Sequence, residues 1–169
     1  MSDSLPQPDE IPSRDKEDAM GAYLMVFGAL HLGLPLPFLG LIAAAIYHAV
    51  NGKKSAFTGF HTYQSLLFSI PASIISAVWI VWGVIVLVGV FGEGPGVPQN
   101  LTAFWVFSVF SLLVYLVYLV FSIIGAVLSR KGRLVYFPVI GRLAYDRYFG
   151  SGRNRRPKPE VRNAPPSGV

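Results

Sequence analysis

Residues 60–91 are the feature that most restricts the fold, because these thirty-two residues, FHTYQSLLFSIPASIISAVWIVWGVIVLVGVF, contain no Asp, Glu, Lys or Arg. A single helix of this length would extend roughly 48 Å at ~1.5 Å per residue, beyond the ~30 Å hydrocarbon core of a bilayer. Pro71 disfavours a helix interior, and Ser69 before it can cap a new helix. The run predicts a membrane span with a kink at Pro71 and residues 60–70 in or near the headgroup layer.

Charge is distributed as in a membrane protein. Apolar residues make up 53% of the chain, and the 14% that are charged lie mainly in the two ends and one short loop. The acidic start and the long first apolar run lack the pattern of a cleaved signal peptide, so we expect the chain to insert and remain in the membrane. The absence of cysteine excludes disulfides, thiolate nucleophiles and cysteine-ligated clusters.

Residues 20–50 are a second apolar segment, interrupted by Pro35 and Pro37. Each half is shorter than the ~20 residues that cross a bilayer as a helix. The lengths favour one span broken by the prolines. A hairpin of two short helices is the alternative.

The last span is predicted over residues 101–129, after a loop at 92–100 that is rich in Gly and Pro. With three spans, Lys53, Lys54 and the ten bases after Ser129 lie on one side of the membrane. By the positive-inside rule this side is the cytoplasm, which places the C-terminus inside and the N-terminus outside a bacterial inner membrane. A hairpin at 20–50 would move the N-terminus inside.

The transmembrane bundle at 20–133 is flanked by polar segments. Residues 1–19 carry six acidic and two basic side chains and are predicted to be a flexible tail, as are the basic residues 150–169. Residues 134–149 mix aromatic and basic side chains, which suits a segment on the membrane surface. Anchoring to anionic headgroups explains these bases better than nucleic-acid binding. The expected headgroup contacts are Arg130, Lys131, Arg133, Arg142 and Arg147.

Two stripes of small and polar residues predict where the spans pack together. Each stripe recurs at alternating three- and four-residue spacings, which places its members on one helix face. In lipid, small residues and interhelical hydrogen bonds hold helices together. The stripe of the central helix is Ser65, Ser69, Ala72, Ser76, Trp79 and Gly83, and that of the last is Ser108, Ser111, Tyr115, Tyr118, Ser122, Gly125 and Ser129. The same faces could instead bind the helices of a partner.

No carboxylate, lysine or arginine lies inside a predicted span, although pumps, transporters and intramembrane hydrolases are built from such groups. The sequence has no catalytic triad, metal-ligand spacing or phosphate-binding loop. We therefore expect no enzyme activity, no cofactor, no metal and no small-molecule substrate. His48 and His61, expected at a similar depth, are the only candidate cofactor ligands, for a haem or a chlorophyll.

Two short motifs give the chain a resemblance to a known family. Phe60, His61 and Gln64 belong to an FHxxQS opening of the central helix, and Tyr136 and Pro138 to a GRxxYFP ending. Over roughly residues 23–143 the chain resembles a family of small bacterial membrane proteins of unknown function. That family is distantly similar to the multi-span channel-associated subunit of the chloroplast inner-envelope import machinery. The resemblance implies a bundle of three or four helices that handles other membrane polypeptides.

The predicted fold is therefore an all-α integral membrane bundle of three spans, or of four helices if residues 20–50 form a hairpin. We expect a non-catalytic accessory subunit of a larger respiratory, photosynthetic or secretory complex, with lipid and other membrane proteins as partners. One alternative is protein translocation or membrane insertion. The other is electron transfer through haem or quinone bound at His48 and His61.

Overall fold

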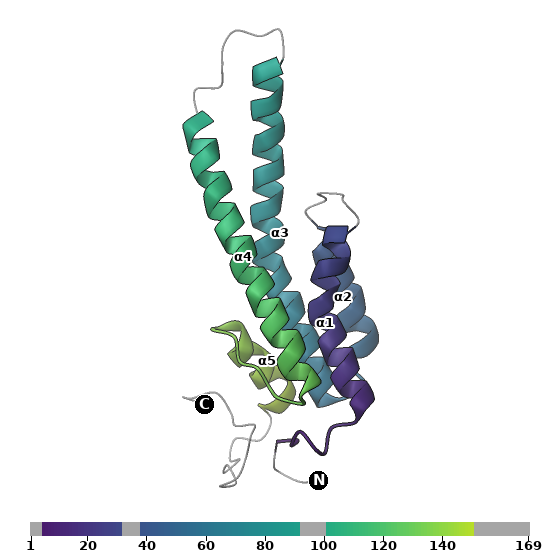
Figure 1. Cartoon of the computed structure of the whole chain (residues 1–169). Helices are drawn as coiled ribbons and strands as arrows, with labels where there is room; N and C mark the ends of the chain where they lie inside the picture. Colours follow the sequence, from purple (N-terminus) through teal and green to yellow (C-terminus); the bar gives the residue numbers. More distant parts are fainter. Residues whose placement is uncertain (1–4, 32–37, 92–100, 151–169) are drawn as a thin grey trace.

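The computed structural model describes residues 5–31, 38–91 and 101–150, and the elements within these ranges are helices (Figure 1). This agrees with the predicted all-α class. Pro35, Pro37, the loop at 92–100 and the tail at 151–169 lie outside the described residues. The helices are α1 (Ser13–His31), α2 (Leu39–Asn51), α3 (Ala56–Phe91), α4 (Leu101–Arg130) and α5 (Ile140–Phe149).

Among the described residues, α3 and α4 are the two helices that are long and apolar enough to cross a membrane. In the most apolar stretch of α3, only 6% of the residues are buried within the protein, and in α4 the share is 28%. A core helix of a soluble protein would bury most of such a stretch, so these apolar surfaces are suited to lipid or to partner helices. Figure 1 shows both helices extending well past α1 and α2.

The segment predicted at 20–50 is two helices that run antiparallel, so the preferred single broken span is wrong and the hairpin is present. Tyr47, near the end of α2, donates a hydrogen bond to the Asp18 carbonyl near the start of α1 at 3.0 Å. Lys54, just after α2, forms a 2.7 Å ion pair with the same Asp18. The sequence could not decide this point, because either arrangement removes the two apolar halves from water.

The N-terminal segment is also structured from Leu5 onward, so the prediction of a flexible tail over 1–19 is wrong for most of its length. α1 begins at Ser13, and Leu5 and Ile11 are each only 5% exposed. They belong to one apolar cluster, which consists of Leu5, Ile11, Ala19, Phe57, Phe60, Leu134, Ala144, Tyr145 and Phe149. A few apolar residues in an acidic tail are enough to fix it when a surface from other helices is ready to bury them.

These contacts place both ends of the described chain at one end of the bundle. We call it the basic end, and it holds Lys53, Lys54, Arg130, Lys131 and Arg133. Arg130, at the end of α4, pairs with Glu17 of α1 at 2.8 Å. The N-terminal and C-terminal segments therefore lie together, which favours the alternative in which the hairpin brings the N-terminal segment to the side of the C-terminal one.

Pro71 does not divide the central run, because α3 is one helix of 36 residues through it. The Ser69 hydroxyl does not cap a new helix but donates to the Leu66 carbonyl at 2.7 Å. Neighbouring helices and serine side chains let membrane helices tolerate an internal proline. Residues 60–70 are consequently part of α3 rather than a separate segment, and most of those from Phe60 to Ser65 are buried in the protein.

Residues 134–149 do not lie free on a surface. Ala144 is fully buried, and Tyr145 and Phe149 are each 4% exposed against the start of α3. The arginines of α5, Arg142 and Arg147, are exposed on its other side. α5 is thus an amphipathic helix docked on the bundle.

Candidate functional site

The first turns of α3 are the most enclosed part of the described protein. Phe60, His61 and Gln64 have no exposed surface, in a helix whose far half is largely open. They are enclosed because α1, α2 and α5 all pack against this part of α3. The FHxxQS motif therefore forms the centre of the basic end.

His61 is held by a tyrosine from α1. The Tyr23 hydroxyl lies 3.0 Å from His61 Nδ1, and both side chains are buried. The ring edges of Phe57 and Phe60 enclose the imidazole, with centroids 4.5 and 5.0 Å away. Nε2 is buried and has no hydrogen-bond partner among the described residues. One nitrogen is thus engaged and the other is not.

Two further polar groups are buried beside this histidine. Both amide atoms of Gln64 and the hydroxyl of Tyr136 have no hydrogen-bond partner among the described residues. Burial, with the neighbouring Tyr145, raises the pKa of the Tyr136 phenol, which keeps it protonated. A buried polar group without a partner costs about 1–3 kcal/mol. Polar character at this position therefore opposes stability, which is a mark of sites kept for binding or specificity rather than for folding.

The second motif reaches the first because of a glycine turn after α4. Gly132 has φ of +70°, the Gly132 N–H donates to Ser129 and the Arg133 N–H donates to Leu128. These two bonds define a Schellman motif, which needs a left-handed residue just past the helix end. The turn sends the chain back along the bundle.

The chain after this turn carries the YFP part of the motif to α3. The Tyr136 ring meets Phe60, with centroids 5.7 Å apart. Phe137 meets Tyr23 at 6.0 Å. Pro138 is exposed and lies at the turn into α5. Two motifs about 70 residues apart in sequence thus form one cluster, which we call the motif cluster: Tyr23, Phe60, His61, Gln64, Tyr136 and Phe137.

The comparison with protein families covers this cluster in full. Residues 15–144 match the magnetosome magnetite crystal formation protein family. The chain belongs to this family. The match begins in α1 and ends in α5, so it includes the hairpin, both long helices and both motifs. No curated protein and no solved structure shows significant similarity to the chain.

Membership of the magnetosome family supports the predicted resemblance in its coarse form, that of a small bacterial membrane protein. It shows no link to the chloroplast import machinery, and that part of the resemblance remains a prediction. The family description concerns crystal formation and names no reaction.

The structure does not bring His48 and His61 to a common pocket. His48 Nδ1 lies 2.8 Å from the Thr62 hydroxyl, and Tyr148 lies 3.5 Å from Nε2. Burial raises the pKa of the Tyr148 phenol, so its proton remains available for this contact. Adjacent helix residues point about 100° apart, so the side of α3 that meets His48 is not the side that carries His61. The geometry adds no support for a haem bound between them.

The predicted stripes lie where α3 meets α1 and α4. Ser65 donates to the Ala22 carbonyl of α1 at 2.7 Å, and the Trp79 indole donates to Ser108 at 2.9 Å. A Cβ on Gly125 would meet the Tyr23 ring, and one on Gly83 would only touch Phe104. Six further members of the stripes are buried: Ser69, Ala72, Ser111, Tyr118, Ser122 and Ser129. Ser76 is half-buried, and Tyr115 bonds the Ala72 carbonyl at 3.4 Å.

The expected headgroup bases differ in their surroundings. Arg130 is paired with Glu17, and the Arg147 guanidinium lies 4.7 Å above the Tyr63 ring. Lys131, Arg133 and Arg142 are exposed. All five lie at the basic end, as a headgroup role requires.

Sequence reasoning missed the contribution of α1 to the site. Tyr23 is the direct partner of His61, and Glu17 and Asp18 fix α1 to α4 and to the loop after α2. The alternating basic and acidic residues 14–18, directly before an apolar run, were the available sequence signal that α1 begins before residue 20. Nothing in the sequence paired Tyr23 with His61.

Proposed function

We propose that this protein is a non-catalytic integral membrane subunit that binds other membrane proteins through the halves of α3 and α4 that lie away from the basic end. We call these the far halves of the two helices. Its part in magnetite crystal formation, the role named for its family, would be to assemble partners in the membrane around the crystal. The magnetosome family match supports the process, and the exposed helices support the mode of action.

The exposed far halves of α3 and α4 are the observation that carries this proposal. The α1–α2 hairpin covers the two long helices only near the basic end (Figure 1). Beyond it, Ile85 and Val88 are 60% and 63% exposed, and Trp105 of α4 is 61% exposed. The sides of these two helices that do not face each other are thus open, among the described residues, to partner helices, which pack by shape in lipid.

The lack of ionisable groups supports binding rather than catalysis. Between Lys54 and Arg130 the described residues contain no Asp, Glu, Lys or Arg, and His61 is enclosed. No group of three or more His, Asp or Glu side chains in the described ranges could hold a metal. A reaction would need an acid, a base or a nucleophile that a substrate can reach.

The membrane arrangement that fits these features has α3 and α4 crossing the bilayer. The α1–α2 hairpin would then enter from the basic end without crossing. By the positive-inside rule the basic end faces the cytoplasm, and the N-terminal segment lies there too. This arrangement places every described charged side chain on one side.

The test is the composition of the protein purified from its native membrane in mild detergent, measured by native mass spectrometry. We expect a fixed stoichiometry with at least one other membrane protein. Two tryptophans in the far half, Ile85→Trp with Val88→Trp, should release that partner. The matched pair on the hairpin, Ile42→Trp with Ile46→Trp, replaces side chains of similar exposure and should not. A chain that carries only lipid, or equal retention by both pairs, would contradict the proposal.

A further inference from the structure

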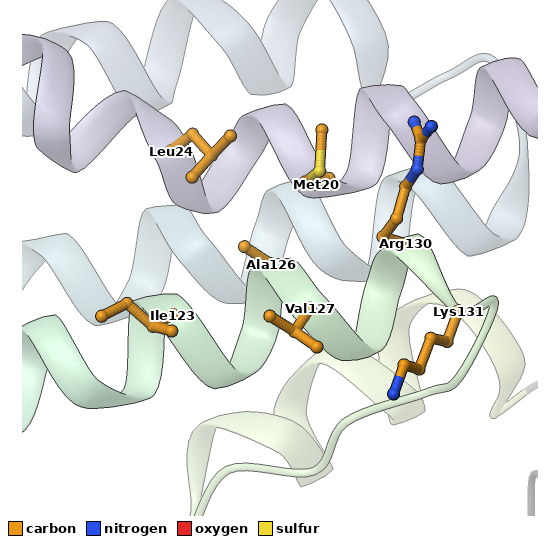
Figure 2. A pocket seen from close by; sticks show the side chains of 7 residues that line it. All are labelled: Met20, Leu24, Ile123, Ala126, Val127, Arg130 and Lys131. Carbon is orange, nitrogen blue, oxygen red and sulfur yellow. The ribbon is translucent and has the colours of Figure 1, made fainter.

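A groove between α1 and α4 opens on the outside of the bundle, and its floor packs against Tyr23 and Phe137 of the motif cluster on the inner side. Its walls are Met20 and Leu24 from α1 and Ile123 and Val127 from α4, and its floor is Ala126. Figure 2 shows these side chains along the two helices, with two basic residues at one end. The cavity has a volume of about 470 Å³, within the roughly 300–1,000 Å³ of ordinary ligand sites.

The groove exists because a small residue lies between larger ones. Ala126 is 5% exposed, whereas Leu24, Ile123 and Val127 are 40% to 48% exposed around it. The Cβ of Ala126 is too short to fill the space that the flanking side chains enclose. All the surface that lines the groove is apolar, including the hydrocarbon stems of Arg130 and Lys131, so an apolar chain fits it and a polar ligand does not.

The end of the groove is positively charged. Arg130 and Lys131 lie there, at the C-terminus of α4. Arg130 is partly neutralised by Glu17, with which it forms an ion pair at 2.8 Å. Lys131 is exposed and forms no ion pair with the described residues, and Lys16 lies beside Gly132, one residue further on. The balance of charge at this end is therefore positive.

We propose that this groove is a specific site for an anionic phospholipid, with one acyl chain between α1 and α4 and the phosphate at Lys131. A basic pocket between membrane helices at the cytoplasmic side is the usual setting for an anionic headgroup. An acyl chain must lie along the helices to reach such a headgroup, and the groove runs in that direction (Figure 2). The site depends on the membrane position of the bundle and not on its role as a subunit.

Native mass spectrometry of the purified protein with equal amounts of phosphatidylglycerol and phosphatidylcholine of identical chains tests the headgroup part. We expect the first bound lipid to be phosphatidylglycerol. Lys131→Gln should reduce that preference about five-fold, the effect of one base near an anionic surface. Lys53→Gln removes another exposed base from the basic end and should leave the preference unchanged. Equal preference in the two variants would overturn the proposed headgroup contact.

A second pair of variants tests the acyl-chain part. Ile123→Trp should fill the groove and remove the first bound lipid. Ile124→Trp changes the adjacent residue, which is 40% exposed and does not line the groove, and should bind lipid as the wild type does. Thermal midpoints in lipid-free detergent identify any variant that misfolds. If folded Ile123→Trp retains the same lipid as Ile124→Trp, the groove is not the site, whatever partners the far halves of α3 and α4 bind.

Discussion

Gly125→Ala should destabilise the bundle, because this glycine is where α4 meets Tyr23. A Cβ at this position would lie 2.7 to 2.9 Å from three carbon atoms of the Tyr23 ring. The ring cannot easily move aside, since Tyr23 is 2% exposed, bonds His61 at 3.0 Å and meets Phe137. The substitution therefore forces α1 and α4 apart or breaks the contact with His61.

The magnitude follows from three terms. Overpacking of this kind costs about 1–3 kcal/mol. Loss of the Tyr23–His61 hydrogen bond costs about 1 kcal/mol more. Alanine is favoured over glycine within a helix by about 1 kcal/mol, which offsets the second term. The net loss is about 1–3 kcal/mol, or roughly a 5- to 150-fold change in the unfolding equilibrium constant.

Reversible unfolding in mixed detergent micelles measures this loss. Gly83→Ala is the matched control, because its Cβ would lie an ordinary 3.7 Å from the Phe104 ring. It should be as stable as the wild type or slightly more so. A double-mutant cycle with Tyr23→Phe should show that this change costs less in the Gly125→Ala variant than in the wild type, since the bond is already broken there. Equal stability of the two alanine variants, or strict additivity in the cycle, would refute the reasoning.

Three smaller predictions use the same unfolding assay. Gly132→Ala should lower the free energy of unfolding by more than about 1 kcal/mol, because φ is +70° and a Cβ would lie 3.0 Å from the Pro8 Cα. An unchanged free energy of unfolding would mean that the turn after α4 has a different conformation. Ser65→Ala removes the hydrogen bond to the Ala22 carbonyl and should lower the free energy of unfolding by about 0.6–2 kcal/mol. An unchanged free energy of unfolding would argue against α1 packing on α3 at this position. Val139→Gly should raise the free energy of unfolding by about 1 kcal/mol, because this exposed β-branched residue has φ of +62°. A lower free energy of unfolding would exclude a strained backbone at this turn.

The long apolar runs could be predicted because the physics there is local. A run without charges that exceeds the thickness of a bilayer has few alternatives to a membrane helix, and α3 and α4 lie where the sequence placed them to within a few residues. The spacing of Ser65 and Ser69 likewise follows from helix geometry alone. These features need no knowledge of the rest of the chain.

The hairpin and the N-terminal helix could not be predicted in the same way, because they depend on distant partners. The residues around Pro35 permit either a kink or a reversal, and the choice depends on surfaces of α3 and α4 that only the folded bundle supplies. Leu5 and Ile11 look isolated in an acidic tail until Phe60 and Tyr145 are brought beside them. Sequence patterns do not show such contacts between segments.

The motif cluster was predictable only in part. Phe60, His61 and Gln64 were recognised as a motif, and so were Tyr136 and Pro138. The two motifs come together only because the chain reverses at Gly132. The positive φ of Gly132 belongs to the folded structure and was not read from the sequence pattern.

The most direct test of this arrangement is to measure on which side of the membrane each segment lies. Because the natural sequence has no cysteine, only an introduced cysteine can react with a thiol reagent. Single cysteines at Asp9, Lys53, Lys131 and Thr102 would be treated with a membrane-impermeant maleimide in sealed vesicles. The account predicts that the first three react from one side and Thr102 from the other. Reaction of Asp9 from the side of Thr102, or of all four from one side, would contradict it.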